Sequence, residues 1–447
     1  MPNENSLPIK KSSYVTKAFV KQKLLFFLFS FFSVVCLAFV VFYLGFHNYI
    51  KVESLAKLTK TNQNQVLQAS TVQTANPHAN GDTKKVLDWI ANLPNKTNNR
   101  VISGQHLVGS PRYGVATTLQ NVQDIYNKTG KWVALVGASY GDGATASYNH
   151  ATNQLLIGYW GNNGLVELYY PVYNPWTGGK ASDTSVRLSA SNIDELISDG
   201  GTVNQRWLAE LDKTAAGLAE LQTEGVVVLW RPFHEMTYGA GNWWSFGAGD
   251  PAPYIKLWRH MFNYFTNTKG LNNLLWVFAV ADTAYWNDVT APYPGANYVD
   301  IVGVDVYSNV AMPRGDAYEK LTGLGKPFAF TENGPGTILD GSYNALRIIS
   351  SIKSYYPKTV YFQEWSSWTD AKVALGDILN CSSLLADSWI ITREEVDWKP
   401  GVDSPNLSDL IDFLQNWGAP TPSRLDFNND KIVNSVDFMI LVDAISG

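Results

Sequence analysis

The feature that most constrains the fold is a series of short apolar runs that alternate with helix-forming stretches between residues 82 and 391. In one such stretch, over residues 204–225, apolar side chains recur at helical spacing up to a final glycine. Alternation of this kind predicts parallel strands joined by crossover helices. The runs cover residues 101–103, 132–136, 165–170, 226–230, 274–280, 298–304, 327–331 and 359–362.

Eight strand–helix units predict an α/β fold of the TIM-barrel type, (β/α)8, with some enlarged loops. A doubly wound open sheet is the alternative. The first run continues as Gly104, Gln105 and His106 and has no glycine-rich phosphate loop after it, which argues against a dinucleotide-binding sheet. In a barrel, catalytic side chains follow the carboxyl ends of the strands.

The N-terminal part predicts a membrane anchor. Residues 24–46 form an uncharged apolar run that is long enough to cross a membrane as a helix. Lysines are concentrated before it, so we expect residues 1–23 in the cytoplasm and the rest of the chain outside the cell. Residues 47–81 are rich in Thr, Gln, Asn and Ala and are expected to form a spacer. A cleaved signal peptide and a secreted product are the alternative.

Composition narrows the range of partners. The net charge of −5 over 447 residues provides no general basic field, so a nucleic-acid partner is not expected. Only Cys36 and Cys381 are present, which excludes a disulfide scaffold and a multi-cysteine metal site. The 16 Trp, 23 Tyr and 20 Phe residues indicate a large packed body.

Two glutamates follow strands that a barrel would place across one mouth. Glu235 lies in the segment VVVLWRPFHEM, shortly after the fourth run, and Glu332 directly follows the seventh run in PFAFTENG. Cleavage of a glycosidic bond uses one protonated and one ionised carboxyl group, and a separation of about 5–5.5 Å leads to retention of configuration. The alternative is that each glutamate caps a loop or pairs with Arg231.

Several segments carry a resemblance to a known family. RPFHEM and GAGNWWSFG, with GQH at 104–106, NPWTGG at 174–179, GVDVY at 303–307 and TENG at 331–334, resemble glycoside hydrolase family 26, which belongs to a clan of retaining barrel enzymes. The resemblance implies that Glu235 is the acid/base, that Glu332 is the nucleophile, and that catalysis needs no cofactor. The expected substrate-binding residues follow strand ends, except for the two neighbouring tryptophans in a glycine-rich loop. They are His106, Arg231, His234, Trp243, Trp244, Tyr307 and Trp365.

Within this set the resemblance implies different tasks. His234 is expected to bond the substrate or the acid/base region, and Tyr307 to hydrogen-bond the nucleophile. The three tryptophans are expected to line sugar subsites, because the C–H groups of a pyranose stack on an aromatic face; a place in the core is the alternative. Arg231 is also expected to brace the mouth through ion pairs, and His106 to be either a substrate contact or a structural donor.

The family's best-known activity implies an endo-β-1,4-mannanase that acts on a β-mannan-type polysaccharide. A β-1,3-xylanase or a mixed-linkage β-glucanase of the same family is the alternative, because the histidine that family mannanases carry near the end of strand three is absent and Pro171 lies in that region. A non-catalytic glycan-binding surface protein is the alternative from another class, although both carboxylates are present.

The C-terminal region, residues 394–447, is expected to form a small helical module after the barrel domain at 82–393. One segment has the alternating oxygen ligands of a calcium loop and resembles a type I dockerin repeat. A second copy, 28 residues earlier, lacks the early acidic ligands, so one structural Ca²⁺ rather than two is expected; a surface turn without an ion is the alternative. A dockerin-like module would suit a cohesin-like partner, but a folded cap without such a partner is left open. The predicted ligands are Asp426, Asn428, Asp430, the carbonyl of Ile432, Asn434 and Asp437.

Overall fold

The computed structural model describes residues 72–107, 119–140, 146–239, 241–246, 249–282 and 288–399. The predicted anchor at 24–46 and the predicted calcium loop with its dockerin-like repeats lie outside these residues. Across the described ranges, no helix combines the length and the apolar character that a membrane crossing requires.

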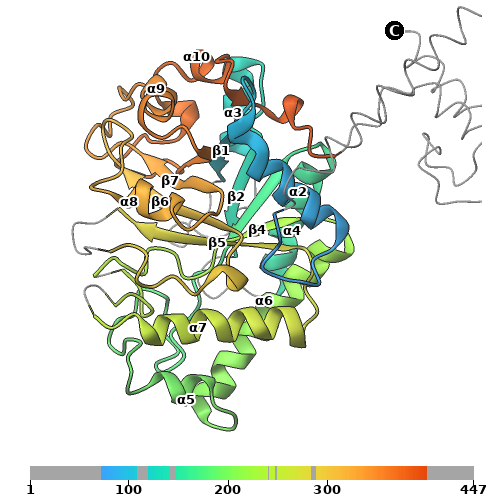
Figure 1. Ribbon diagram of the computed structural model, residues 1–447, viewed down its shortest axis with the longest axis vertical. Helices are drawn as coiled ribbons and strands as arrows, with labels where there is room; N and C mark the ends of the chain where they lie inside the picture. Colours follow the sequence, from blue (N-terminus) through green and yellow to red (C-terminus); the bar gives the residue numbers. More distant parts are fainter. Residues whose placement is uncertain are drawn as a thin grey trace, which may run out of the picture. The chain divides into compact units, whose positions relative to one another are not determined.

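The strands close into a barrel, which confirms the predicted (β/α)8 architecture. Every strand is parallel to its neighbours in the order β2-β3-β4-β5-β6-β7-β8-β1, and pairing of β1 with β2 completes the ring (Figure 1). The strands are β1 Val101–His106, β2 Leu135–Ser139, β3 Leu165–Tyr169, β4 Val228–Trp230, β5 Leu274–Ala281, β6 Ile301–Tyr307, β7 Phe328–Gly334 and β8 Thr359–Glu364. A short ninth strand, β9 at Ile390–Ile391, pairs in parallel with the first two residues of β1.

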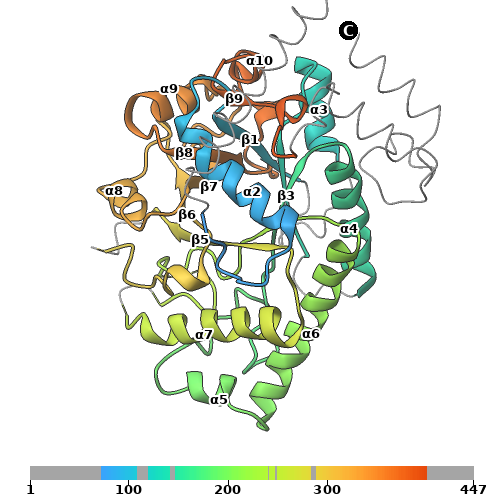
Figure 2. The ribbon, with the colours of Figure 1, turned by 45° about the vertical axis from the view of Figure 1, so that its right-hand side comes forward.

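Helices surround the strands, as the two ribbon views show (Figures 1 and 2). The longest of them, α6, buries Trp207, Leu211 and Leu218 against the barrel and is followed by Gly225, whose φ of +69° suits glycine. The helices are α2 Gly81–Asn92, α3 Gln120–Thr129, α4 Ala146–Gly161, α5 Ile193–Ile197, α6 Thr202–Thr223, α7 Ala252–Asn263, α8 Ala317–Thr322, α9 Leu346–Tyr355 and α10 Cys381–Leu385.

Both ends of the described chain pack on the barrel. The N–H of Ala75, in the predicted spacer, donates to the buried carboxylate of Asp300 at 2.6 Å. At the other end, Asn163 donates to the carbonyl of Val396 at 2.7 Å, and Trp398 packs on Trp160. The packed body thus includes residues on either side of the 82–393 range expected for the barrel domain.

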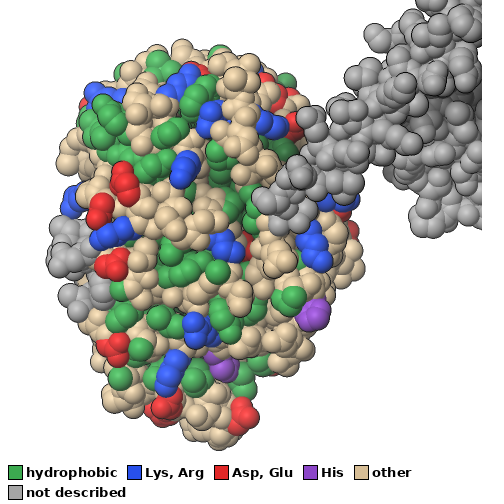
Figure 3. Space-filling model, in the orientation of Figure 1, with side chains coloured by type: hydrophobic (Ala, Val, Ile, Leu, Met, Phe, Trp, Pro, Cys, Tyr) green, Lys and Arg blue, Asp and Glu red, His purple; other side chains and the backbone are tan. Residues whose placement is uncertain are grey.

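The surface shown in Figure 3 carries basic and acidic side chains interspersed with polar and apolar ones. Neither sign of charge dominates this face. The strongest concentration of charged groups in the described chain is instead internal, at the carboxyl ends of the barrel strands, where Glu167, Arg231 and Asp305 are all buried.

Candidate active site

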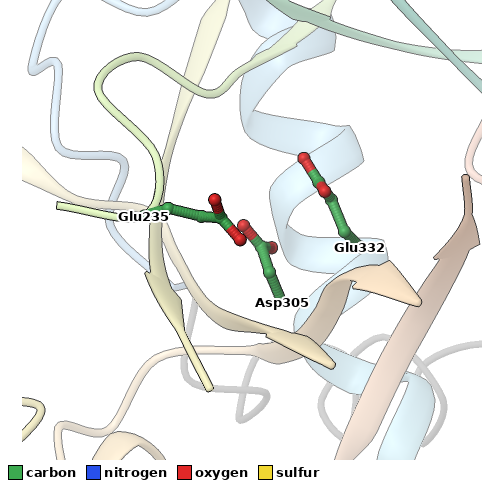
Figure 4. Close-up of side chains that lie close together, drawn as sticks. All are labelled: Glu235, Asp305 and Glu332. Atoms are coloured by element: carbon green, nitrogen blue, oxygen red, sulfur yellow. The ribbon is translucent and has the colours of Figure 1, made fainter. Parts of the chain in front are cut away.

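The loop after β4 holds its glutamate in an unusual backbone conformation. Phe233 and Glu235 have φ values of +50° and +54°, a region that residues with side chains seldom adopt. Three hydrogen bonds fix this turn: Glu235 N–H to the carbonyl of Ala279 at 3.1 Å, Tyr238 N–H to the carbonyl of Glu235 at 2.9 Å, and Trp244 Nε1 to the carbonyl of His234 at 3.0 Å. The turn directs Glu235 toward the ends of β6 and β7 (Figure 4).

Three carboxyl groups converge there. One oxygen each from Glu235, Asp305 and Glu332 lies within 4.8 Å of the other two (Figure 4). Carboxylates converge in this way in metal sites too, but here the cation facing Glu332 is the guanidinium of Arg231, at 2.9 Å. The predicted meeting of Glu235 and Glu332 at one mouth therefore agrees with the geometry.

The two glutamates have different environments. Burial raises the pKa of Glu235 to about 8; the negative charge of Glu332 adds to this effect and the positive charge of Arg231 opposes it. Glu332 instead accepts two hydrogen bonds, from Arg231 Nη1 at 2.9 Å and from the Tyr307 hydroxyl at 2.9 Å. One carboxyl group is thus set up to carry a proton, and the other is stabilised as an anion.

Tyr307 lies at the end of β6 and donates a hydrogen bond to Glu332, the residue it was expected to contact. Burial, followed by the charges of Glu332 and Glu235, raises the pKa of its hydroxyl well above the usual value. The phenol therefore remains a neutral hydrogen-bond donor to Glu332.

Arg231 is an internal ion-pair residue. Its side chain is fully buried, with Nε 2.6 Å from Glu167, Nη1 2.9 Å from Glu332 and Nη1 3.6 Å from Asp305. The expected bracing through ion pairs is present. The expected direct contact with substrate needs correction, because the guanidinium has no exposed surface at the mouth.

An aromatic wall lines the side of the mouth formed by β1, β3 and β8. Trp365 is half-buried and stacks on His106, with ring centroids 4.1 Å apart. The ring of Tyr169 lies edge-on to that of His234, with ring centroids 5.0 Å apart. Its centroid is 6.0 Å from that of Trp365. Trp365 keeps part of its ring exposed, so its expected role in a sugar subsite stays a prediction.

The two histidines differ in exposure. His106 is completely buried, so it supports Trp365 and does not touch substrate, which corrects the expected contact. Burial and the charge of Arg231 lower its pKa to about 3 and keep it neutral. The side chain of His234 is 13% exposed, with Nε2 3.8 Å from Glu332, as a substrate-binding residue beside the nucleophile would be. Burial followed by Arg231 also lowers the pKa of His234.

Trp243 and Trp244 are core residues, which corrects their expected place in sugar subsites. Both are completely buried. The chain after β3 folds over them: Trp243 N–H donates to the carbonyl of Ala181 at 3.0 Å, and its carbonyl accepts from Leu188 at 2.9 Å. Their glycine-rich sequence surroundings suggested exposure, but the long β3–α5 connection that covers them has no clear signal in the sequence.

Sequence reasoning missed two residues of this site on β3. Glu167 pairs with Arg231, and Tyr169 joins the aromatic wall. A charged residue within the otherwise apolar run LVELYY was a signal for the first, because a carboxylate on an inner strand needs a buried partner. The second follows from its place at the end of a barrel strand.

Comparisons with known proteins agree with this geometry. Residues 75–395 match the glycosyl hydrolase family 26 profile. A mannan endo-1,4-β-mannosidase A and B of Caldalkalibacillus mannanilyticus is 36% identical over 79% of this chain and 68% of its own length. A mannan endo-1,4-β-mannosidase of Bacillus subtilis is 36% identical over 74% of this chain and 91% of its own.

A solved structure agrees in fold. The Bacillus subtilis mannanase man26 superimposes with a TM-score of 0.64 and 33% identity, covering 72% of this chain and 96% of that one. The family profile match extends through the whole barrel and includes the loop after β4, which carries Glu235, and strand β7, which carries Glu332. The chain therefore belongs to glycoside hydrolase family 26 and is a glycoside hydrolase.

Proposed function

We propose that this glycoside hydrolase is a retaining endo-β-1,4-mannanase. The observation that supports it best is the approach of Glu235 and Glu332 oxygens to within 4.8 Å, in environments that favour a protonated and an ionised carboxyl group. This separation is close to the 5–5.5 Å of retaining enzymes and shorter than the roughly 6.5–9.5 Å of inverting ones. The substrate assignment is supported by the relatives, which are mannan endo-1,4-β-mannosidases.

The reaction proceeds by double displacement. In the first step an oxygen of Glu332 attacks the anomeric carbon while Glu235 donates its proton to the departing glycosidic oxygen, so that a glycosyl ester forms and the bond to the leaving sugar breaks. In the second step Glu235, now ionised, removes a proton from water, whose oxygen displaces Glu332. Glu235 ends protonated and Glu332 ends ionised, as both began.

The rest of the mouth serves binding. Trp365 offers a partly exposed aromatic face for one sugar unit, and His234 offers a neutral polar edge beside the nucleophile. The region around Pro171, after β3, lacks the histidine that family mannanases carry near the end of strand three, so the glycone-side sugar contacts are expected to differ from the family pattern. A xylan- or glucan-cleaving member of the family would be expected to differ from a mannanase in these sugar contacts.

The test is a substrate panel. The purified chain is assayed for reducing-end release from β-mannan, β-1,3-xylan and mixed-linkage β-glucan, with Glu235→Ala and Glu332→Ala as controls. The proposal predicts fastest release from mannan and loss of release in both variants. Fastest release from another glycan would replace mannan with that substrate, and no release from any glycan would favour a glycan-binding protein.

We also propose that residues 24–46 anchor the enzyme in the cell membrane with its catalytic domain outside. Support comes from the apolar run and the lysines before it. Protease treatment of intact cells should remove the barrel from the membrane fraction, leaving the N-terminal segment behind. Recovery of the full-length barrel in the medium would favour a cleaved signal peptide.

The C-terminal repeat is proposed to bind one structural Ca²⁺ and to offer a surface for a cohesin-like partner. Support is limited to the spacing of ligands from Asp426 to Asp437. Elemental analysis of the full chain should find one calcium, and the Asp426→Ala variant should lose it. A calcium-free wild-type chain after dialysis against micromolar Ca²⁺ would remove the ion from the proposal.

A further inference from the structure

One buried carboxylate of the barrel interior has no task in the proposed reaction. Glu167 lies on β3 and is fully buried. Its Oε1 accepts a 2.6 Å hydrogen bond from Nε of Arg231, while Nη1 of the same guanidinium donates to Oε1 of Glu332 at 2.9 Å. Arg231 therefore joins Glu167 to the nucleophile through two different nitrogen atoms.

The surroundings of Glu167 leave it little freedom. Nε2 of Gln363, on β8, donates to the same Oε1 at 3.3 Å. The side-chain amide of Gln363 fills the space beside Gly137, where an added Cβ would collide with it, and at Gly104 an added Cβ would collide with the backbone of β8 at Phe362. Because glutamine and glycines interlock in this way, Glu167 is held against Arg231, and the guanidinium is fixed in turn.

The ion pair between Glu167 and Arg231 also affects the charge that Glu332 experiences. Arg231 faces Glu167 at 2.6 Å, Glu332 at 2.9 Å and Asp305 at 3.6 Å, all in the buried layer under the mouth. An anionic Glu167 offsets part of the positive charge that Glu332 experiences. Without this offset, the guanidinium would stabilise the anionic nucleophile more strongly and make it less reactive.

We propose that Glu167 is a positioning residue for hydrolysis, which holds Arg231 against Glu332 and offsets part of its charge. The inference rests on the proposed double displacement, because it assigns Glu167 a role through the nucleophile of that reaction. Glu167 itself does not touch the substrate, since no part of its side chain is exposed.

The pKa of Glu235, the proposed acid/base, should depend on the charge of Glu167. The charged and titratable groups that face Glu235 are Arg231 on the same segment, Asp305 and Tyr307 on β6, and Glu332 on β7. Arg231 lowers the pKa of Glu235 against the opposing effects of burial and Glu332. When Glu167 is replaced by a neutral residue, the guanidinium charge is less compensated and the pKa of Glu235 falls. The alkaline decline in activity then begins at a lower pH than in the wild type.

The decisive variant is Glu167→Gln in the full chain, measured on the glycan that the wild type cleaves. Its amide oxygen can still accept from Arg231, but the negative charge is gone. We expect kcat to fall about tenfold, with KM within about twofold. The alkaline limb of kcat/KM should move down by about half a pH unit.

Two further variants make the result specific. Asp300→Asn neutralises another fully buried carboxylate, which accepts hydrogen bonds from the backbone N–H groups of Ala75 and Trp276 and lies away from Arg231. It should lower the Tm and leave the alkaline limb in place. Glu167→Asp keeps the charge but is one methylene shorter, so it should lower kcat while its alkaline limb stays close to that of the wild type.

Wild-type kcat and an unmoved limb in Glu167→Gln would overturn the inference. If that variant does not fold, Glu167→Asp decides the positioning role: a reduced kcat supports it and an unchanged kcat overturns it. Failure of the proposed function is a separate result, since then the wild type would release no sugar, or Glu235→Ala would remain active.

Discussion

The hydroxyl of Tyr307 donates a hydrogen bond of 2.9 Å to Oε2 of Glu332, while Arg231 donates to the other oxygen of the same carboxylate. Both oxygens of Glu332 are therefore held by donors, one directly after β4 and the other at the end of β6. This arrangement fixes the carboxylate plane before substrate arrives. During attack the carboxylate loses its negative charge to the new bond with the anomeric carbon, so its two hydrogen bonds weaken.

Removing the tyrosine donor should slow catalysis. In Tyr307→Phe, Glu332 loses the hydrogen bond that orients its carboxylate plane for attack; a hydrogen bond to a charged group is typically worth about 1.5–3 kcal/mol. We expect kcat to fall by about 10- to 100-fold while the Tm changes little. Tyr355→Phe is the matched control, because Tyr355 is 60% exposed on α9 and should leave kcat unchanged. Equal rates for Tyr307→Phe and the wild type would show that this hydroxyl does not assist the nucleophile.

The pH profile should reflect the acid. Glu235 must be protonated to donate to the leaving oxygen, and its pKa is raised to about 8. Activity should therefore be present below this pH and decline as the pH rises through it. Glu235→Ala, assayed with an aryl mannoside whose leaving group needs no protonation, should lack this decline. An alkaline limb at the same pH in the variant would assign it to another group.

The aromatic wall should affect substrate binding. Trp365→Ala removes the partly exposed ring that stacks on His106 at 4.1 Å. We expect kcat/KM to fall by about tenfold or more, since an aromatic stack contributes about 0.5–1.5 kcal/mol beyond the buried area itself. Trp365→Phe should recover part of the loss. If alanine had no effect on short mannooligosaccharides, Trp365 would lie outside the sugar subsites.

The tryptophan that the structure places in the core should affect stability instead. Trp243→Ala creates a cavity beside Trp207 and Phe233 and should lower the free energy of unfolding by about 3–5 kcal/mol. Urea unfolding followed by circular dichroism measures this loss. Below the unfolding transition KM should stay near the wild-type value. A stable variant with a raised KM would return Trp243 to the substrate-binding surface.

The barrel could be predicted because its strands are fully buried and read as separate apolar runs. Two runs begin three residues too early. The run at 132–136 starts before β2, which begins at Leu135, and Trp132 instead stacks on Tyr126 outside the barrel. The run at 298–304 likewise starts before β6, which begins at Ile301. Trp132 is as apolar as the true strand residues, so composition alone could not separate them.

The meeting of Glu235 and Glu332 was predictable because one lies in the loop after β4 and the other near the carboxyl end of β7. The burial of Trp243 and the bridge from Glu167 through Arg231 to Glu332 depend on contacts between segments far apart in the chain. Such contacts leave no periodic pattern in the sequence. The φ of +54° at Glu235 was equally hidden, because the residue there is not a glycine.

The stereochemistry of the first product tests the central claim most directly. Proton NMR during the first minutes of mannan hydrolysis distinguishes the α- and β-anomers of the new reducing end before they interconvert. Attack by Glu332 followed by attack of water predicts that the β-anomer appears first. Initial accumulation of the α-anomer would mean a single displacement and would contradict the roles given to Glu235 and Glu332.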